Sequence, residues 1–200
     1  MPIIAKKGGE FQLASAGSHE AVCCAVWDLG YQSRVWNNQE DIVKQVTIAW
    51  EIAETIKDEK SKYYGKRLVI SKRYTNSLGS KANLRKDLES WRGRGFAKEE
   101  LEGFDLERLI GVNCLLSVVH NGSNNNTYAN VTAIMKTMNG KEKMIAENPK
   151  DFCPDWVKKI QAKAIPEESE HQSQEPDVDT SKLDNDEANN SFDPDNEVPF

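Results

Sequence analysis

An abrupt change in composition near residue 165 limits which part of this chain can fold. Residues 166–200 contain one Lys and twelve Asp or Glu, a net charge of −11. Their only large apolar residues are Val178, Leu183, Phe192, Val198 and Phe200. Such a segment buries too little apolar surface to offset the entropy that it would lose on ordering. We therefore expect a disordered acidic tail at 166–200 and a folded body before it.

The body carries the opposite charge. Residues 1–165 contain 25 Lys or Arg and 20 Asp or Glu, a net charge of +5, which together with the tail gives the −6 of the whole chain. A basic body can bind polyanions while an acidic tail binds proteins, and the tail can also compete for the body's basic groove. A protein that mimics DNA through its own acidity would lack the positive body.

Hydrophobic patterning predicts three strands in the first half of the body. Residues 21–29 are almost all apolar or small, as in a strand covered on both faces, and Gly30 is expected to end that strand. Apolar and polar residues alternate along 44–52, which indicates a half-buried antiparallel strand. A third strand is predicted at 67–75, and its polar side is basic.

A helix is predicted to follow the third strand. Leu84, Leu88 and Trp91 recur at the i, i+4, i+7 spacing that forms one apolar stripe on a helix. Ser80 is a suitable N-cap, and Gly93 is expected to end the helix. The stripe predicts that this helix packs against the body.

Two further strands, at 112–120 and 127–137, are predicted around a polar hairpin loop, and a C-terminal helix is expected at 154–164. Three strands, a helix and two strands is the chain order of an OB-fold, a mainly β, five-stranded barrel with a helix between its third and fourth strands. The expected parts are a flexible N-terminal segment (1–18), an OB-fold domain (19–140), a C-terminal helical extension (141–165) and the disordered tail (166–200).

Catalytic and metal-binding motifs are missing from the sequence. Four cysteines form no Cys-x-x-Cys pair, and Cys23 and Cys24 would point to opposite faces of a strand, so buried free thiols are expected. A zinc site would have to combine His19 and His120 with such cysteines. Phosphate-loop, nucleophile-elbow and His-Glu-x-x-His motifs do not occur. We therefore expect no enzyme activity, no metal and no cofactor, with a metal-dependent nuclease as the rival hypothesis.

Basic and aromatic residues gather in the middle of the body. A protein that binds single-stranded DNA needs cations that contact the phosphates and flat aromatic rings on which the bases stack. The candidate DNA-binding residues are Tyr31, Arg34, Trp36, Tyr63, Tyr64, Lys66, Arg67, Lys72, Arg73, Tyr74, Lys81, Arg85, Arg92 and Arg94.

A plainer interpretation is that these residues are solvated cations and core aromatics. We expect Trp50 and Trp91, on apolar faces, to be core residues, whereas Trp36 lies in a polar stretch that favours an exposed loop. Arg92 and Arg94 are suited to phosphates, but one of them is expected instead to pair with a nearby carboxylate and brace the helix.

The chain ends in acids followed by an apolar-Pro-Phe sequence. Phe200 can fill a small apolar pocket on a partner while its carboxylate and neighbouring acids meet Arg or Lys there. The residues expected to form this partner-binding tip are Asp193, Asp195, Glu197, Val198, Pro199 and Phe200. An ordinary frayed acidic terminus is the alternative.

The tip resembles that of bacterial single-stranded DNA-binding proteins, which has several Asp residues before Ile-Pro-Phe; here Val198 stands in place of the Ile. Residues 20–140 also resemble a group of phage-encoded proteins of the single-stranded DNA-binding type. The Trp-Arg-Gly-Arg block at 91–94 is the most specific part of that resemblance, which also runs through 26–30, 70–75, 83–90, 104–106, Gly111 and 128–131.

These resemblances imply a protein that coats and protects single-stranded DNA during phage replication or recombination and recruits replication, recombination or repair proteins through its tip. The alternatives are a phage adaptor that binds no DNA and occupies host enzymes through the tip, and a strand-annealing protein. No transmembrane run or secretory signal is recognisable, so the bacterial host cytoplasm is the expected location, without membrane partners. The oligomeric state stays open, a homo-oligomer included.

Overall fold

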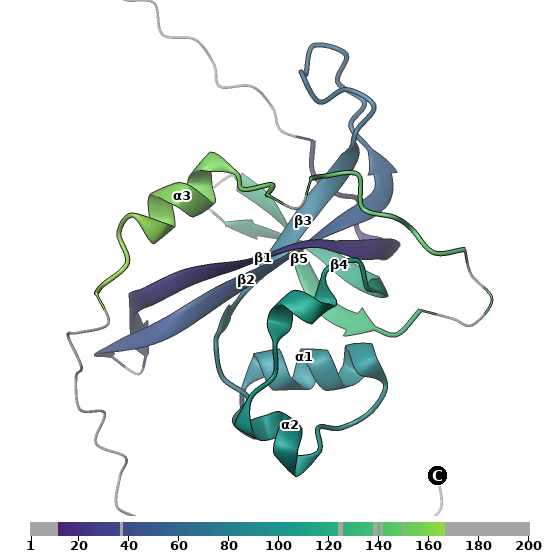
Figure 1. The fold of residues 1–200 in the computed structure, drawn as a ribbon. Coiled ribbons are helices and arrows are strands. Elements are labelled where there is room, and N and C mark those ends of the chain that lie inside the picture. The colour runs from purple at the N-terminus through teal and green to yellow at the C-terminus, as the bar shows by residue number, and fades with distance from the viewer. Residues whose placement is uncertain are drawn as a thin grey trace, which may run out of the picture. The chain divides into compact units, whose positions relative to one another are not determined.

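Five antiparallel strands form one sheet in the order β3-β2-β1-β4-β5 (Figure 1). In chain order they are β1 (Gly17–Trp36), β2 (Gln39–Thr55), β3 (Arg67–Thr75), β4 (Asn113–Ser123) and β5 (Asn126–Met135). The two edge strands, β3 and β5, approach each other, so the sheet curls toward a barrel. The mainly β class predicted from the sequence is confirmed.

The computed structural model describes residues 12–36, 38–123, 126–137, 140, 142–149 and 151–166. The acidic tail from residue 167 onward, with the tip, therefore lies outside the described residues.

The predicted third strand coincides with β3, but β1 is much longer than the predicted 21–29. Gly30 does not end β1. It follows the register shift between Asp28 and Gly30, where it takes a φ of +69°, a conformation that costs glycine little. A Cβ on Gly30 would lie 2.8 Å from the Cβ of Ala164, so this position also needs a residue without a side chain. A glycine that looks like a strand end is here a bend within the strand.

The predicted central helix is α1 (Asn83–Arg92), with Leu84, Leu88 and Trp91 buried as expected. Ala82, rather than Ser80, occupies the N-cap position, and Gly93 ends the helix in the left-handed conformation. Three short helical elements complete the fold: α2 (Lys98–Glu102), the 3-10 helix η1 (Leu106–Leu109) and α3 (Asp155–Gln161). Figure 1 shows α1 and α2 together on one side of the sheet, with α3 apart from them.

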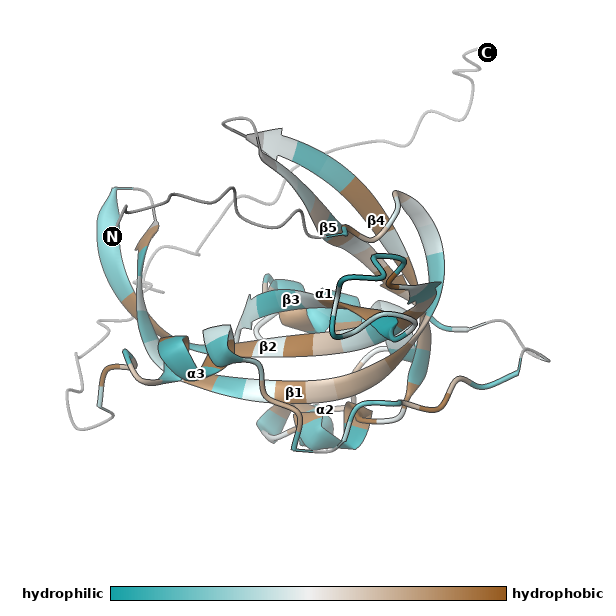
Figure 2. Cartoon of the chain, turned by 90° about the horizontal axis from the view of Figure 1, so that it is seen from above, coloured by the Kyte–Doolittle hydropathy of each residue, from teal (hydrophilic) through white to brown (hydrophobic). Residues whose placement is uncertain are grey.

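Two apolar clusters pack against opposite faces of β1. The larger cluster fills the inside of the curled sheet, where Trp50 contacts Trp91 of α1 with ring centroids 5.9 Å apart. The smaller cluster lies on the outer face of β1 and β2 and is closed by Val157 of α3. Figure 2 shows the apolar stretches of β1 and β2 that these clusters cover. Both predicted core tryptophans, Trp50 and Trp91, are thus confirmed.

The adjacent cysteines of β1 illustrate this two-sided burial. Cys23 belongs to the inner cluster and Cys24 to the outer one, as their positions in a strand predict. Burial raises the pKa of the Cys24 thiol to about 12, with a smaller effect from the Glu51 carboxylate. Both thiols are free and buried, as expected, and Cys114 is too, whereas Cys153 is half-buried.

The segments on either side of the predicted OB-fold domain also pack against the sheet. Ala14 is buried, and Gln12 and Ser15 bind the Glu54 carboxylate at the end of β2. At the other end, the Ile165 backbone N–H donates to the Tyr31 carbonyl at 2.9 Å. The residues packed on the sheet therefore include some from the segments predicted as a flexible N-terminal segment (1–18) and a C-terminal helical extension (141–165).

Residues 142–149, which we call the strap, cross the outer face of the sheet and are held by Glu51. This β2 carboxylate is fully buried and accepts from the backbone N–H groups of Glu147 and Asn148 at 2.8 and 2.7 Å. Arg67 lies 3.7 Å from the same carboxylate and donates to the Ile145 carbonyl at 2.8 Å. The hydrogen bonds and the ion pair of this buried carboxylate, together with the Arg67 hydrogen bond, thus hold the strap against β2 and β3.

We expect the Glu51→Ala substitution to lower the free energy of unfolding by about 3 to 5 kcal/mol, because it leaves buried N–H groups and the Arg67 charge without their partner. Urea denaturation monitored by circular dichroism measures the change. Glu59→Ala, in an exposed loop, is the control and should stay within about 0.5 kcal/mol of the wild type. Equal stability of the two variants would show that the strap is held by other contacts.

Candidate nucleic-acid interface

The outward-facing residues of β3 form an open strip beside the covered part of the sheet. Leu68 and Ile70 point into the inner cluster, so the alternate residues point outward. Val69 is 37% exposed, and Arg73 is exposed and forms no ion pair with any described residue. We call this strip the β3 face; it consists of Arg67, Val69, Ser71, Arg73 and Thr75.

A loop of residues 57–66 joins β2 to β3 at one end of this face, and we call it the tyrosine loop. Tyr63 and Tyr64 are 50% and 56% exposed, side by side. Turn hydrogen bonds from the Tyr64 N–H to the Ser61 carbonyl and from the Lys66 N–H to the Tyr63 carbonyl fix the backbone. Gly65, with a φ of +73°, closes the loop. Two aromatic rings are therefore presented to solvent on an ordered backbone.

The tyrosine loop is also basic, since it carries four Lys against one Asp and one Glu. The Lys62 ammonium lies 4.7 Å from the centre of the Tyr63 ring. The pKa of Lys62 is raised, mainly by a hydrogen bond with Tyr63 and to a lesser degree by the Asp155 carboxylate of α3. Lys66 is exposed at the start of β3. The loop thus combines rings and cations, as a single-strand binder requires.

At the other end of the β3 face, β1 and β2 continue as a two-stranded arm of residues 31–44. Arg34 of the arm pairs with Asp41 at 2.9 Å and donates to the Thr75 hydroxyl at 3.2 Å, which ties the arm to β3. The Lys44 ammonium lies 5.9 Å from the Tyr31 ring centre. Trp36 lies at the end of β1. The arm therefore brings two of the predicted residues, Tyr31 and Arg34, to the same end of the face. Trp36 belongs to a strand rather than to the expected loop, and its side chain is outside what the structure describes.

Two predicted residues of β3 belong instead to the inner side. Tyr74 is 4% exposed and donates its hydroxyl to Asp87 of α1 at 2.8 Å, and Lys72 pairs with the same carboxylate at 2.7 Å. Burial, followed by the Asp87 charge, raises the pKa of Tyr74. A buried ring offers no face to a base, so the prediction that Tyr74 stacks on DNA does not fit this structure.

The predicted cations of α1 and of the turn after it are paired with glutamates. Arg85 binds Glu89 at 2.9 Å, and both Arg92 and Arg94 bind Glu100 of α2. The Arg92 guanidinium also stacks on Phe96 and Phe104, at 4.3 and 5.2 Å from the ring centres. The bracing interpretation expected for one of the two arginines therefore holds for both.

Two of the remaining predicted residues complete this comparison. Lys81 is exposed in the turn before α1 and is not part of the β3 face. Arg67 starts the β3 face but holds Glu51 and the strap, so its charge is already engaged. The structure thus gathers Tyr63, Tyr64, Lys66 and Arg73, with the arm, along one face.

Trp156, on the first turn of α3, is an exposed aromatic residue that sequence analysis missed. It is 40% exposed, although its neighbour Val157 is fully buried. The helical spacing of Trp156, Val157 and Ile160 predicts the C-terminal helix but does not show which of these side chains is exposed. Adjacent residues of a helix point about 100° apart, so a short helix that packs on a sheet buries one of such a pair more deeply than the other.

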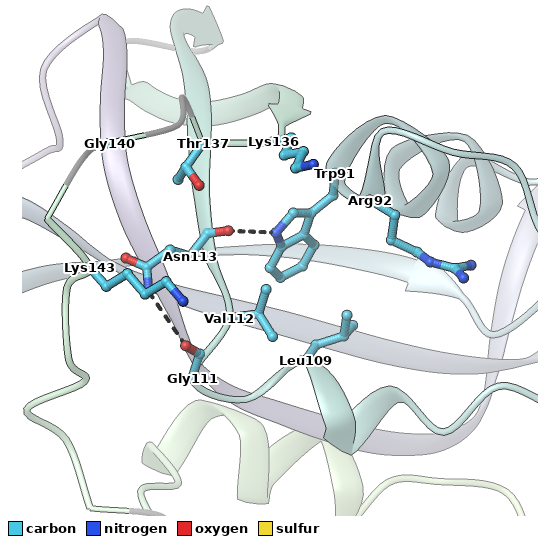
Figure 3. Close-up of a pocket in the computed structure, with 10 residues that line it drawn as sticks. All are labelled: Trp91, Arg92, Leu109, Gly111, Val112, Asn113, Lys136, Thr137, Gly140 and Lys143. Atoms are coloured by element: carbon cyan, nitrogen blue, oxygen red, sulfur yellow. Dashed lines mark hydrogen bonds between the residues drawn. The ribbon is translucent and has the colours of Figure 1, made fainter.

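A separate hollow of about 520 Å³ opens beside the end of α1 and the start of β4. Figure 3 shows its lining, in which the Trp91 indole N–H donates to the Asn113 carbonyl at 3.0 Å and the Arg92 side chain points away. Lys136 and Lys143 flank it, and none of its lining residues is acidic.

In the described part of the chain, no group of three or more His, Cys, Asp or Glu residues is arranged to hold a metal ion. None of the helices found there combines the length and apolarity needed to cross a membrane. No protein-family model and no curated protein matches this chain.

The Glu100 cluster predicts a dependence of stability on pH. Hydrogen bonds from Arg94, the Ala97 N–H and Arg92 lower the pKa of Glu100 from 4.5 to about 2. Because the folded state then binds fewer protons than the unfolded state, the stabilisation is present above pH 4.5 and is lost as the pH falls toward 2. Urea midpoints measured across this range should fall more steeply for the wild type than for Glu100→Gln. Parallel curves would contradict the assignment.

Proposed function

We propose that the body is an OB-fold that binds single-stranded DNA along the β3 face. The fold is supported by the chain order of three strands, α1 and two strands, and by the β3-β2-β1-β4-β5 order of a sheet whose edges approach each other. A five-stranded Greek-key barrel that closes between its third and fifth strands has this arrangement. In OB-folds, oligonucleotides bind on the face of strands 2 and 3 and on the loops that join strands 1 and 2 and strands 4 and 5.

The observation that carries the proposal is the exposed pair Tyr63 and Tyr64, set among lysines next to the β3 face. Base stacking on such rings contributes about 1 to 3 kcal/mol per base and does not depend on sequence. Arg73, which has no acidic partner among the described residues, is free to meet a phosphate. Rings and cations together favour an unpaired strand, because duplex bases are already stacked on one another.

The proposed role is binding without catalysis: the protein would coat and protect exposed strands during phage replication or recombination. Recruitment of partner enzymes by the tip, from Asp193 to Phe200, is part of this proposal and rests on the sequence resemblance alone, because the tip lies outside the described residues. Strand annealing is a neighbouring function that the same surface would serve. A tip-dependent adaptor that binds no DNA is the alternative.

A double substitution of the loop tyrosines tests the proposal. Tyr63→Ala with Tyr64→Ala should weaken binding of a fluorescent poly-dT oligonucleotide about 5- to 150-fold for each base that loses its ring. Tyr63→Phe with Tyr64→Phe keeps both rings and should bind nearly as the wild type does. Fluorescence anisotropy gives the affinities, with duplex DNA of the same length as a competitor. If the wild type binds duplex as tightly as the single strand, or binds neither, the proposed function is wrong, and failure to bind either DNA favours the adaptor.

Arg73 is expected to act through charge. We expect Arg73→Ala to reduce the slope of log affinity against log salt concentration by about 0.7, the value for one phosphate contact on a single strand. Arg108→Ala is the matched control, because Arg108 is also exposed but lies on η1, outside the β3 face. Titrations at several salt concentrations compare the slopes. The same slope for Arg73→Ala and the wild type would remove Arg73 from the interface.

A further inference from the structure

One row of residues crosses the outer face of the sheet from β1 to β3. Trp27 of β1 stands opposite Thr47 of β2, and Thr47 stands opposite Arg73 of β3. Since neighbouring strands lie about 4.8 Å apart, the backbones of Trp27 and Arg73 are separated by about 10 Å. All three residues face outward. A residue that packs on Trp27 therefore shares one surface with the Arg73 cation, which forms no ion pair within the described part of the chain.

The residue that lies on Trp27 is Trp156 of α3. Their ring centres are 5.7 Å apart with an interplanar angle of 89°, so one ring meets the other edge to face. Trp27 itself is fixed, because its indole N–H donates to the Phe152 carbonyl at 2.9 Å and its ring also packs on Phe152. Trp156 therefore rests on an immobile support while 40% of its surface stays open to solvent.

The helix that carries Trp156 is itself held at both ends. Val157 is fully buried against the outer cluster, and the Gln161 side-chain amide donates to the Asp28 carbonyl at 2.7 Å. The Ile165 N–H bonds to Tyr31 just beyond the helix. An exposed indole on such a fixed helix loses little further freedom when a flat ligand stacks on it.

Asp155, the neighbour of Trp156 at the start of α3, makes a small electrostatic contribution to the raised pKa of Lys62 in the tyrosine loop. The Lys62 ammonium lies 4.7 Å from the centre of the Tyr63 ring. Trp156 thus stands over the β1 end of the row that leads to Arg73, and the charge of its neighbour Asp155 relates it to the tyrosine loop. An isolated exposed Trp is common on protein surfaces, but this one continues a surface that already has rings and cations.

We propose that Trp156 is a further base-stacking residue, so that a single strand passes from the tyrosine loop over Trp156 while Arg73 binds its phosphates. This inference rests on the proposed function and extends it: the C-terminal segment from the strap to α3 is part of the binding surface as well as a cover for the outer cluster. Without the segment that follows β5, the proposed binding surface would lack Trp156.

Two substitutions separate stacking from packing. Trp156→Leu keeps an apolar side chain over Trp27 but removes the flat ring, and it should weaken poly-dT binding about 5- to 150-fold. Trp156→Phe keeps a flat ring and should stay within about threefold of the wild type. Anisotropy measures both affinities, and the urea midpoints of the two variants show whether either has lost stability.

Tryptophan fluorescence gives a second measurement that does not depend on the Leu variant folding. The measurement uses a Trp36→Phe background, because Trp36 is itself a candidate DNA-binding residue whose emission a bound strand would also quench. Stacking of a base on Trp156 should quench the emission of Trp36→Phe on addition of poly-dT, and the further change Trp156→Phe should abolish most of that quenching while binding is retained. If Trp156→Leu binds as tightly as Trp156→Phe, or if the quenching persists when Trp156→Phe is added to Trp36→Phe, the inference is overturned while the proposed function stands. Failure of the wild type to bind the oligonucleotide would instead overturn both.

Discussion

The burial of β1 on both faces is the constraint on which the rest of the structure depends. A strand that has apolar residues on both of its faces must be packed against other elements on each side. The curled sheet and α1 provide one, and the strap with α3 provides the other. The second cover reaches only the start of β3, where Arg67 binds it, and leaves Val69 and Arg73 exposed. As a result, the exposed part of the β3 face lies beside the segment that runs from the strap to α3.

Charge pairing decides which cations of the body can serve a ligand. The net positive charge of residues 1–165 suggested a broad basic groove, but Arg34, Lys72, Arg85, Arg92 and Arg94 all form ion pairs. The pairs involving α1 connect it to β3 and to α2, so those charges stabilise the helical side of the molecule. What stays available is a smaller set, in which Arg73 and the lysines of the tyrosine loop lie next to exposed rings. The distribution of carboxylates, rather than the number of cations, thus selects the candidate interface.

Local patterns predicted those parts of the fold that depend on local periodicity. Alternation along 67–75 predicted β3, and the spacing of Leu84, Leu88 and Trp91 predicted α1, because each pattern reports one buried face. Gly30 was misjudged since a bulge depends on the partner strand and on Ala164, 134 residues away. Tyr74 was assigned to the DNA-binding surface because nothing in the sequence shows that its hydroxyl reaches Asp87. Trp156 was missed because periodicity in a seven-residue helix does not distinguish the two neighbouring apolar positions.

The close approach of Gly30 and Ala164 has an evolutionary consequence. Any side chain at position 30 would collide with position 164, and a larger residue at 164 would press on the bend in β1. The two positions are therefore a coupled pair that fixes how near the C-terminal segment lies to the sheet. Among homologues that keep this segment, both positions should remain small together. In lineages that lose it, the steric half of the constraint on position 30 disappears, and only the backbone conformation would still favour glycine.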